Sequence, residues 1–138
     1  MVAQDVTDNA ALVRRWVELT NERQFEELRE LWADDLVLHQ GDDLEDIRGF
    51  DAFAQLLGAF YAGFPDLRIA VEDVIASDDL VLMRSTSRGT HTGEFMGIPP
   101  TGRSVEFPGI GTYRIAEGKI VEEWFNDDLH GLMRVIAT

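Results

Sequence analysis

Two adjacent acids near the C-terminus, Asp127 and Asp128, are the first residues in this sequence that could do chemistry. Alternate residues of a regular strand share a face, so Asp128 is expected beside Asn126 and Trp124. A carboxyl group next to an indole ring in an apolar pocket loses hydration, which raises its pKa and makes it a better base for a carbon acid. Asp128 is therefore the predicted catalytic residue. Two alternatives remain: Asp128 could cap a terminal helix, and slippage by one residue would exchange it with Asp127.

Two of the three histidines are candidates for polarising a substrate carbonyl. His39 follows a short predicted strand and His91 opens a loop rich in Gly and Pro, and each could donate a hydrogen bond as an enolate forms. A purely structural histidine is the alternative reading of both, and His130 is expected at the surface. The histidines are far apart in sequence and cysteine is absent, so no metal site is predicted. Dinucleotide, phosphate-loop and serine-elbow motifs are also absent, and we expect no cofactor.

Seven side chains are candidates for contact with a small hydrophobic substrate. Asn126 would orient the substrate or the base from the same strand face as Asp128. The other six are large and apolar, and each could equally belong to a solid core: Trp16, Trp32, Phe53, Phe60, Met96 and Trp124.

The elements that must position these residues follow in a simple order. Apolar residues recur at helical spacing in three segments, residues 8–20, 26–32 and 50–62. Alternating segments predict strands over residues 36–39, 67–71, 80–88, 105–115 and 119–126, and a short helix over 129–136. Glu117-Gly118 is typical of a tight hairpin turn. Helices followed by an antiparallel meander indicate one α+β domain over residues 1–138, with a strongly curved antiparallel sheet and three helices from the N-terminal half enclosing an apolar pocket.

The charge and apolar content restrict the partners. Asp and Glu number 26 against 12 Lys and Arg, which gives a net charge of −14. Nucleic acids and anionic membranes both require a basic face, so neither is an expected partner. Residues 1–9 lack the basic and apolar regions of a signal peptide, and no stretch approaches the ~20 apolar residues of a membrane span. We therefore expect a cytoplasmic protein.

Four segments of the chain resemble the SnoaL-like polyketide cyclases, also called ester cyclases. They are Phe64–Leu67, the loop Gly89–Gly102, the hairpin Glu117–Ile120, and Glu123-Trp124 followed by Asp128 and Gly131. The resemblance covers residues 9–135. It implies the cone-shaped fold shared with ketosteroid isomerase and nuclear transport factor, with Asp128 as the general acid/base of an intramolecular aldol condensation. It also implies a homodimer formed through the convex face of the sheet, for which Val121 and Phe125 would offer apolar surface.

One departure from the family concerns the penultimate strand. The resemblance implies a glutamine and a histidine near the positions that Gly109 and Gly111 occupy here. Either His39 or His91 takes over their role, or the reaction is not an aldol cyclisation. The alternatives are hydroxylation, isomerisation or epoxide hydrolysis on the same fold, or a protein that binds a small molecule without turnover.

Overall fold

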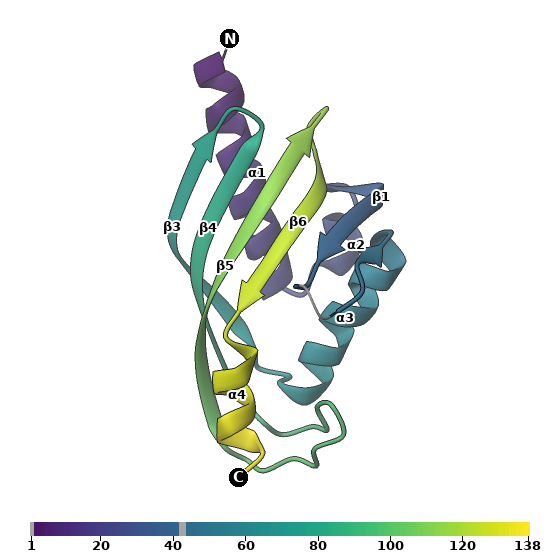
Figure 1. The fold of residues 1–138 in the computed structure, drawn as a ribbon, viewed down its shortest axis with the longest axis vertical. Coiled ribbons are helices and arrows are strands. Elements are labelled where there is room, and N and C mark those ends of the chain that lie inside the picture. Colours follow the sequence, from purple (N-terminus) through teal and green to yellow (C-terminus); the bar gives the residue numbers. More distant parts are fainter. Residues whose placement is uncertain (1, 42–43) are drawn as a thin grey trace.

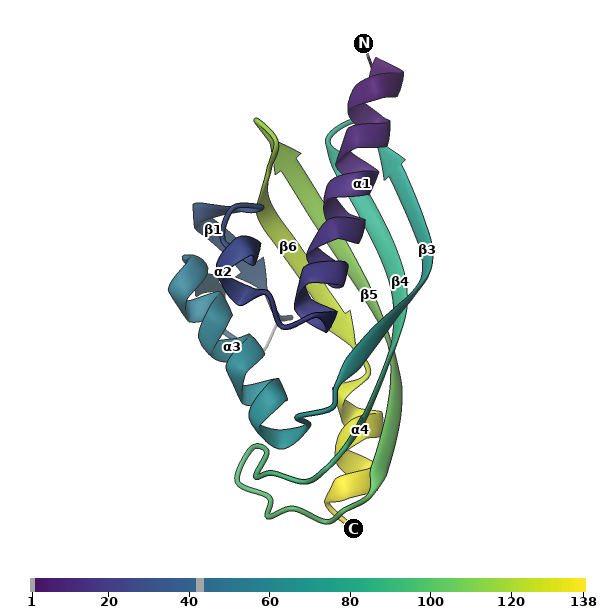
Figure 2. The same cartoon turned by 180° about the vertical axis from the view of Figure 1, so that it is seen from behind.

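The computed structural model describes residues 2–41 and 44–138. Its centre is a six-stranded sheet in the order β2-β1-β6-β5-β4-β3 (Figure 1). The strands are β1 (Trp32–His39), β2 (Ile47–Arg48), β3 (Arg68–Ser77), β4 (Leu80–Thr90), β5 (Ser104–Ala116) and β6 (Lys119–Asp127). The helices are α1 (Val2–Asn21), α2 (Phe25–Leu28), α3 (Phe50–Gly63) and α4 (Leu129–Ile136). This is the α+β fold that the sequence predicts, with helices α1 to α3 on one side of a curved sheet (Figure 2).

The sheet is mixed, whereas the sequence predicts an antiparallel one. Strands β3 to β6 form the expected antiparallel meander, but β1 runs parallel to β6. This pairing is possible because β1 is not joined to β6 by a hairpin, and the helices and strands between them provide the crossover. The outermost strands, β2 and β3, do not pair with each other, so the curved sheet remains open.

Several element boundaries also differ from the prediction. Helix α2 ends at Leu28, and Trp32, expected in that helix, instead begins β1. The polar segment from Gly41 to Arg48, where no strand is predicted, contains the short strand β2, and two of its residues, 42 and 43, lie outside the described part. The β5–β6 hairpin is as predicted: both turn residues, Glu117 and Gly118, have positive φ (51° and 76°), which a two-residue turn of this hand requires.

A β-bulge in β6 decides which side chains reach the concave face. Ile120 pairs with Ile115, but the next pair joins Glu122 to Arg114, so Val121 is an extra residue in β6. Because side chains alternate along a strand, one extra residue exchanges the two faces beyond it. Ile120 points into the core before the bulge, and after it the positions that face the concave side become 123, 125 and 127 instead of 122, 124 and 126.

Two clusters of apolar side chains hold the helices to the sheet. The larger cluster lies between helices α1 and α3 and strands β1, β4, β5 and β6. It includes Trp16, Trp32 and Tyr113, whose rings lie about 6 Å apart. The smaller one joins the end of α3 to the 91–103 loop and to α4 through Phe64, Phe95 and other residues. A pocket lies between these clusters.

Candidate active site

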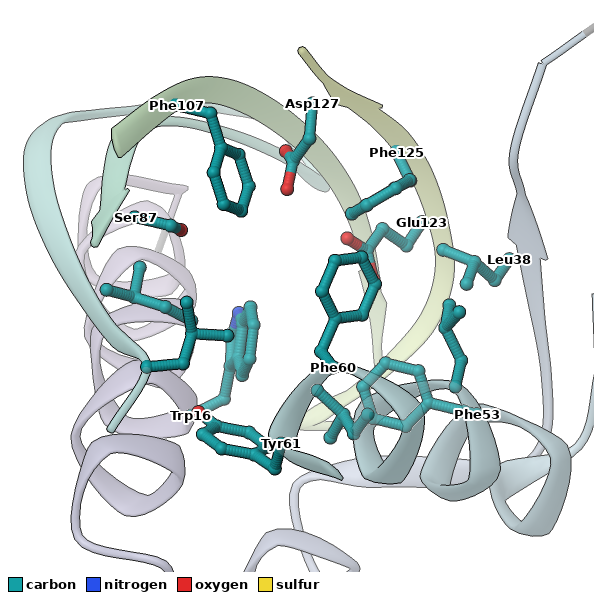
Figure 3. A pocket seen from close by; sticks show the side chains of 14 residues that line it. Trp16, Leu38, Phe53, Phe60, Tyr61, Ser87, Phe107, Glu123, Phe125 and Asp127 are labelled. Atoms are coloured by element: carbon teal, nitrogen blue, oxygen red, sulfur yellow. The ribbon is translucent and has the colours of Figure 1, made fainter. Parts of the chain in front are cut away.

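The pocket opens between the concave face of the sheet and helices α1 and α3 (Figure 3). The unfilled space between its side chains, including the open mouth, is about 540 Å³. Its lining is mostly aliphatic and aromatic: Trp16, Leu38, Phe53, Leu56, Leu57, Phe60, Tyr61, Leu67, Ile69, Ser87, Phe107, Glu123, Phe125 and Asp127. Such a lining with a few polar groups is typical of a site for a small hydrophobic molecule.

Two carboxyl groups from β6, Glu123 and Asp127, point into this apolar space (Figure 3). Glu123 is only 4% exposed, and Asp127 is half-buried. Burial and, to a smaller extent, the charge of Asp127 together raise the pKa of Glu123 to about 8, although a hydrogen bond with Tyr113 opposes the change. Burial also raises the pKa of Asp127, to about 7. No Lys, Arg or His forms an ion pair with either carboxyl within the described chain, which leaves both pKa values high.

Because they lack a side chain, two glycines of β5, Gly109 and Gly111, leave room for polar side chains of neighbouring residues. Gly109 pairs with Asp127 across the strands, and a Cβ at Gly109 would overlap Oδ1 of Asp127. A Cβ at Gly111 would overlap the hydroxyl oxygen of Tyr113. The space beside each glycine is therefore filled by a side chain and is not part of the open pocket. The glycines allow the Asp127 carboxyl and the Tyr113 hydroxyl to lie flat against the strand.

Asp128, the predicted base, lies outside the pocket. Its side chain is exposed, and Oδ1 accepts a 2.8 Å hydrogen bond from the backbone N–H of Gly131, so Asp128 is the N-cap of α4. The prediction that Asp128 faces the pocket is wrong because the bulge at Val121 exchanges the two faces of β6. Asp127, the alternative that strand slippage would select, occupies the pocket position instead.

The bulge also moves Trp124 and Asn126 to the outer face of the sheet. There Trp124 stacks on His39, with ring centroids 5.2 Å apart, and Asn126 is exposed. His39 is held by two carboxylates, Nδ1 at 3.0 Å from Asp46 and Nε2 at 2.6 Å from Glu122. The hydrogen bond with Glu122 is the main reason that the pKa of His39 is raised; burial opposes it. His39 therefore faces away from the substrate pocket, contrary to the prediction.

His91 has a structural position in the 91–103 loop. Its side chain is fully buried and its ring packs on Phe64. Nδ1 accepts a 3.2 Å hydrogen bond from the backbone N–H of Thr101 and lies 3.0 Å from the hydroxyl of that residue. Backbone hydrogen bonds with Gly102 and Arg103 close the loop. His91 does not line the pocket, so its predicted catalytic placement is also corrected.

The apolar candidates divide between the pocket and other regions. Trp16, Phe53 and Phe60 line the pocket, as predicted. Trp32 is a core residue that packs on Phe53 with ring centroids 4.3 Å apart, and Met96 is 70% exposed at the tip of the loop. The sequence reasoning did not identify Glu123 as a site residue. Glu123, Phe125 and Asp127 alternate along β6 and so share one face. This pattern would identify both acids as pocket residues, but only if the position of the bulge were known.

The described residues contain no group of three or more His, Cys, Asp or Glu side chains arranged to hold a metal ion. Within the same part of the chain, no helix has the length and apolarity that a bilayer crossing requires.

Comparison with known proteins gives the family. A family model for SnoaL-like polyketide cyclases matches residues 10–136. The chain belongs to the SnoaL-like polyketide cyclase family. No curated protein sequence matches it significantly.

Solved structures of SnoaL-like proteins have the same fold over nearly the whole chain. IdmH from Streptomyces antibioticus, provisionally described as a polyketide cyclase, is 33% identical with a TM-score of 0.80, over 94% of this chain and 99% of IdmH. AclR from Streptomyces galilaeus, provisionally described as a hydroxylase, is 28% identical with a TM-score of 0.87, over 96% and 97% of the two chains. A SnoaL-like protein from Jannaschia sp. CCS1 has a TM-score of 0.89 at 24% identity, over 96% and 93%.

Proposed function

We propose that this SnoaL-like protein is an enzyme that removes a proton from the carbon beside a carbonyl group of a small hydrophobic molecule, without a cofactor. Asp127 is the base. The observation that carries this proposal is a carboxyl group with its pKa raised to about 7 by burial in an apolar pocket. A base whose pKa lies near the working pH is both largely ionised and strongly basic, which favours proton abstraction.

The first step needs only this carboxylate and the substrate. Asp127 takes the proton, the C–H bond breaks, and its electron pair moves onto the carbonyl oxygen to give an enolate. In a polyketide ester, the enolate carbon then attacks a second carbonyl of the same molecule and closes a ring. The proton on Asp127 passes to the new alkoxide, which restores the base. A pocket that holds the chain folded favours this intramolecular attack.

Asp127 suits the role of base better than Glu123 for two reasons. Asp127 is half-buried and closer to solvent, whereas Glu123 is 4% exposed. The pKa of Asp127 is raised to about 7 and that of Glu123 to about 8, so Asp127 is the first of the two to lose its proton. Paired acids with separated pKa values commonly divide the roles of base and acid.

Hydroxylation is the second candidate reaction, and the similarity to AclR favours it. Hydroxylation would begin with the same proton abstraction, and its oxygen-transfer step would require an oxidant such as dioxygen from outside this chain. The proposal therefore assigns the proton abstraction to Asp127 and takes ring closure as the following step because the family is one of cyclases.

Exchange of carbon-bound hydrogen tests the base without knowledge of the natural substrate. 1-Tetralone is a two-ring ketone whose protons beside the carbonyl can be followed by NMR in D₂O. The wild-type protein should accelerate their replacement by deuterium, and Asp127→Asn should reduce that acceleration by ~10²–10⁴-fold, the usual contribution of a general base. Asp128→Asn is the matched control and should retain it. Equal exchange rates in wild type and Asp127→Asn would exclude Asp127 as the base.

A further inference from the structure

We propose that Ser87 determines the substrate specificity of this pocket by binding a second oxygen of the substrate, remote from the carbonyl group beside which Asp127 removes a proton. This assignment rests on the proposed function and narrows its substrates to apolar molecules with at least two oxygen-bearing groups. A hydroxyl or a carbonyl group can fill the second position, because a serine hydroxyl both donates and accepts a hydrogen bond.

The polar groups of the pocket differ in what a ligand can reach. The indole nitrogen of Trp16 and the hydroxyl of Tyr61 belong to lining residues, but protein covers both atoms. The two carboxyl groups, Glu123 and Asp127, both belong to β6. Among the described lining residues, this leaves Ser87 on β4 as the neutral side chain whose polar atom a ligand can contact.

The hydroxyl of Ser87 is buried in the protein but has no partner there. Ser87 is 7% exposed, and its side chain points into the open space of the pocket (Figure 3). No hydrogen bond joins this hydroxyl to another described residue, and the oxygen is not covered completely as that of Tyr61 is. Because a buried hydroxyl without a partner is unfavourable, a ligand oxygen that pairs with it is favoured over an apolar group.

Apolar side chains flank Ser87 on both neighbouring strands. Ile69 of β3 and Phe107 of β5 pair with it, and both line the pocket. A substrate oxygen placed against either of them would lose its hydration without compensation, whereas one placed at Ser87 gains a hydrogen bond. This wall therefore selects both the presence and the position of the second oxygen.

Ser87 and Asp127 contact different parts of the ligand because β5 separates their strands. Ser87 pairs with Phe107, and Asp127 pairs with Gly109, two residues further along β5. Two strand spacings place the two backbones roughly 10 Å apart across the sheet, and the offset adds roughly 7 Å along it. Both side chains point inward and shorten this gap, so a fused two-ring molecule can contact both.

Binding of 1-tetralone and its 5-, 6- and 7-hydroxy derivatives, measured by calorimetry, tests the contact without requiring turnover. The four ketones share one two-ring body and differ in the presence and position of a second oxygen. At pH 6, where all four are neutral, at least one hydroxy derivative should bind the wild-type protein at least ~5-fold more tightly than 1-tetralone, as one additional hydrogen bond provides. Ser87→Ala should remove most of this preference.

Two further variants separate the hydroxyl from the space that it occupies. Ser87→Thr keeps a hydroxyl and should retain the preference for the hydroxy derivative over 1-tetralone, because an added methyl group affects both ligands alike. Ser85→Ala is the matched control. Ser85 is a buried serine on the same face of β4 that does not line the pocket, so its loss should leave the preference unchanged.

Deuterium exchange gives a second readout that a purely structural role would not produce. Ser87 is remote from the reacting carbon, so its contact is equal in the ground and transition states, and Ser87→Ala should raise KM for the preferred derivative at least ~5-fold with kcat unchanged. Equal affinities of the four ketones for the wild type, including no binding of any, would overturn the assignment. An unchanged preference in Ser87→Ala, or an equal loss in Ser85→Ala, would also overturn it. Binding requires no proton abstraction, so either proposal can fail while the other stands.

Discussion

The two faces of β6 carry similar residue types in very different surroundings. On the outer face, Glu122 lies 2.6 Å from His39 and 3.2 Å from Arg114, and Trp124 covers the histidine. On the inner face, Glu123 and Asp127 have aromatic neighbours, and no cation among the described residues pairs with them. Burial raises the pKa values of the two inner acids, which therefore hold their protons to near-neutral pH. Burial without a partner cation, more than residue type, distinguishes the pocket acids of this strand from Glu122 on the outer face.

The largest expected effect separates the neighbours Asp127 and Asp128. Asp127→Asn should lower proton-abstraction rates by ~10²–10⁴-fold with the fold intact, because it removes a base and keeps the shape. Asp128→Asn should leave both rate and stability unchanged, since Asn caps a helix nearly as well as Asp, and Asp128→Ala should cost ~1 kcal/mol of stability. Deuterium exchange and thermal unfolding of the three variants provide the measurements. A large rate loss in Asp128→Asn would reverse the assignment of the two faces.

The next effect concerns the glycine opposite the base. Gly109→Ala places a methyl group where Oδ1 of Asp127 lies, so the carboxyl must move away from the strand. We expect the exchange rate to fall by at least ~10-fold, because a misplaced base loses its alignment with the substrate. Gly118→Ala, in the β5–β6 turn far from the pocket, is the control: it should reduce stability through its positive φ of 76° and leave the rate of the folded protein unchanged. Equal rates in wild type and Gly109→Ala would contradict the placement of Asp127.

The two faces should also differ in how pH changes stability. Because burial raises the folded-state pKa of Glu123 to about 8, the unfolded chain loses this proton first, and stability falls as pH rises from about 4.5 to about 8. Glu123→Gln should flatten this part of the curve measured by denaturant unfolding. The groups that face Glu123 are Asp127, whose raised pKa gives a slope of the same sign up to about 7, and Tyr113, which stays neutral there.

On the outer face, the raised pKa of His39 makes a contribution that is complete below about 6.5 and is lost as pH rises through the raised value. Asp46, Glu122 and Arg114 are the charged groups around it. His39→Gln should flatten the curve of stability against pH only above about 6.5 and leave deuterium exchange unaffected.

For the inner face, a curve of stability against pH that is unchanged in Glu123→Gln would contradict the burial of a protonated acid in the pocket.

The smallest expected effect concerns association through the outer face. Phe125, expected to contribute to a dimer contact, lines the pocket instead, but Ile75, Leu82 and Ile110 are exposed on strands β3, β4 and β5. The homodimer remains a prediction, with a mass twice the 15.5 kDa of the chain by light scattering at micromolar concentration. Ile110→Lys should weaken such a dimer and leave the pocket unchanged. A monomeric mass for the wild-type chain would contradict it.

The sequence by itself determined the family, the α+β class and the order of elements, because apolar periodicity and turn residues are local signals. It also indicated part of the pocket: Trp16, Phe53 and Phe60 lie on predicted inward faces of helices, where a boundary error of one or two residues does not change the face. Even the alternative between Asp127 and Asp128 was readable from the strand pattern. The hairpin turn at Glu117-Gly118 likewise needed no tertiary contacts to define it.

Only the tertiary structure decided which acids face the pocket. The extra residue at Val121 exists because Ile120 and Glu122 pair with adjacent residues of β5, and that register depends on contacts between strands. A strand has a period of two, so one added residue moves Trp124, Asn126 and Asp128 away from the pocket and brings Glu123 and Asp127 in. The use of Gly109 and Gly111 to make room for Asp127 and Tyr113 likewise arises between strands, where no local pattern in either strand records it.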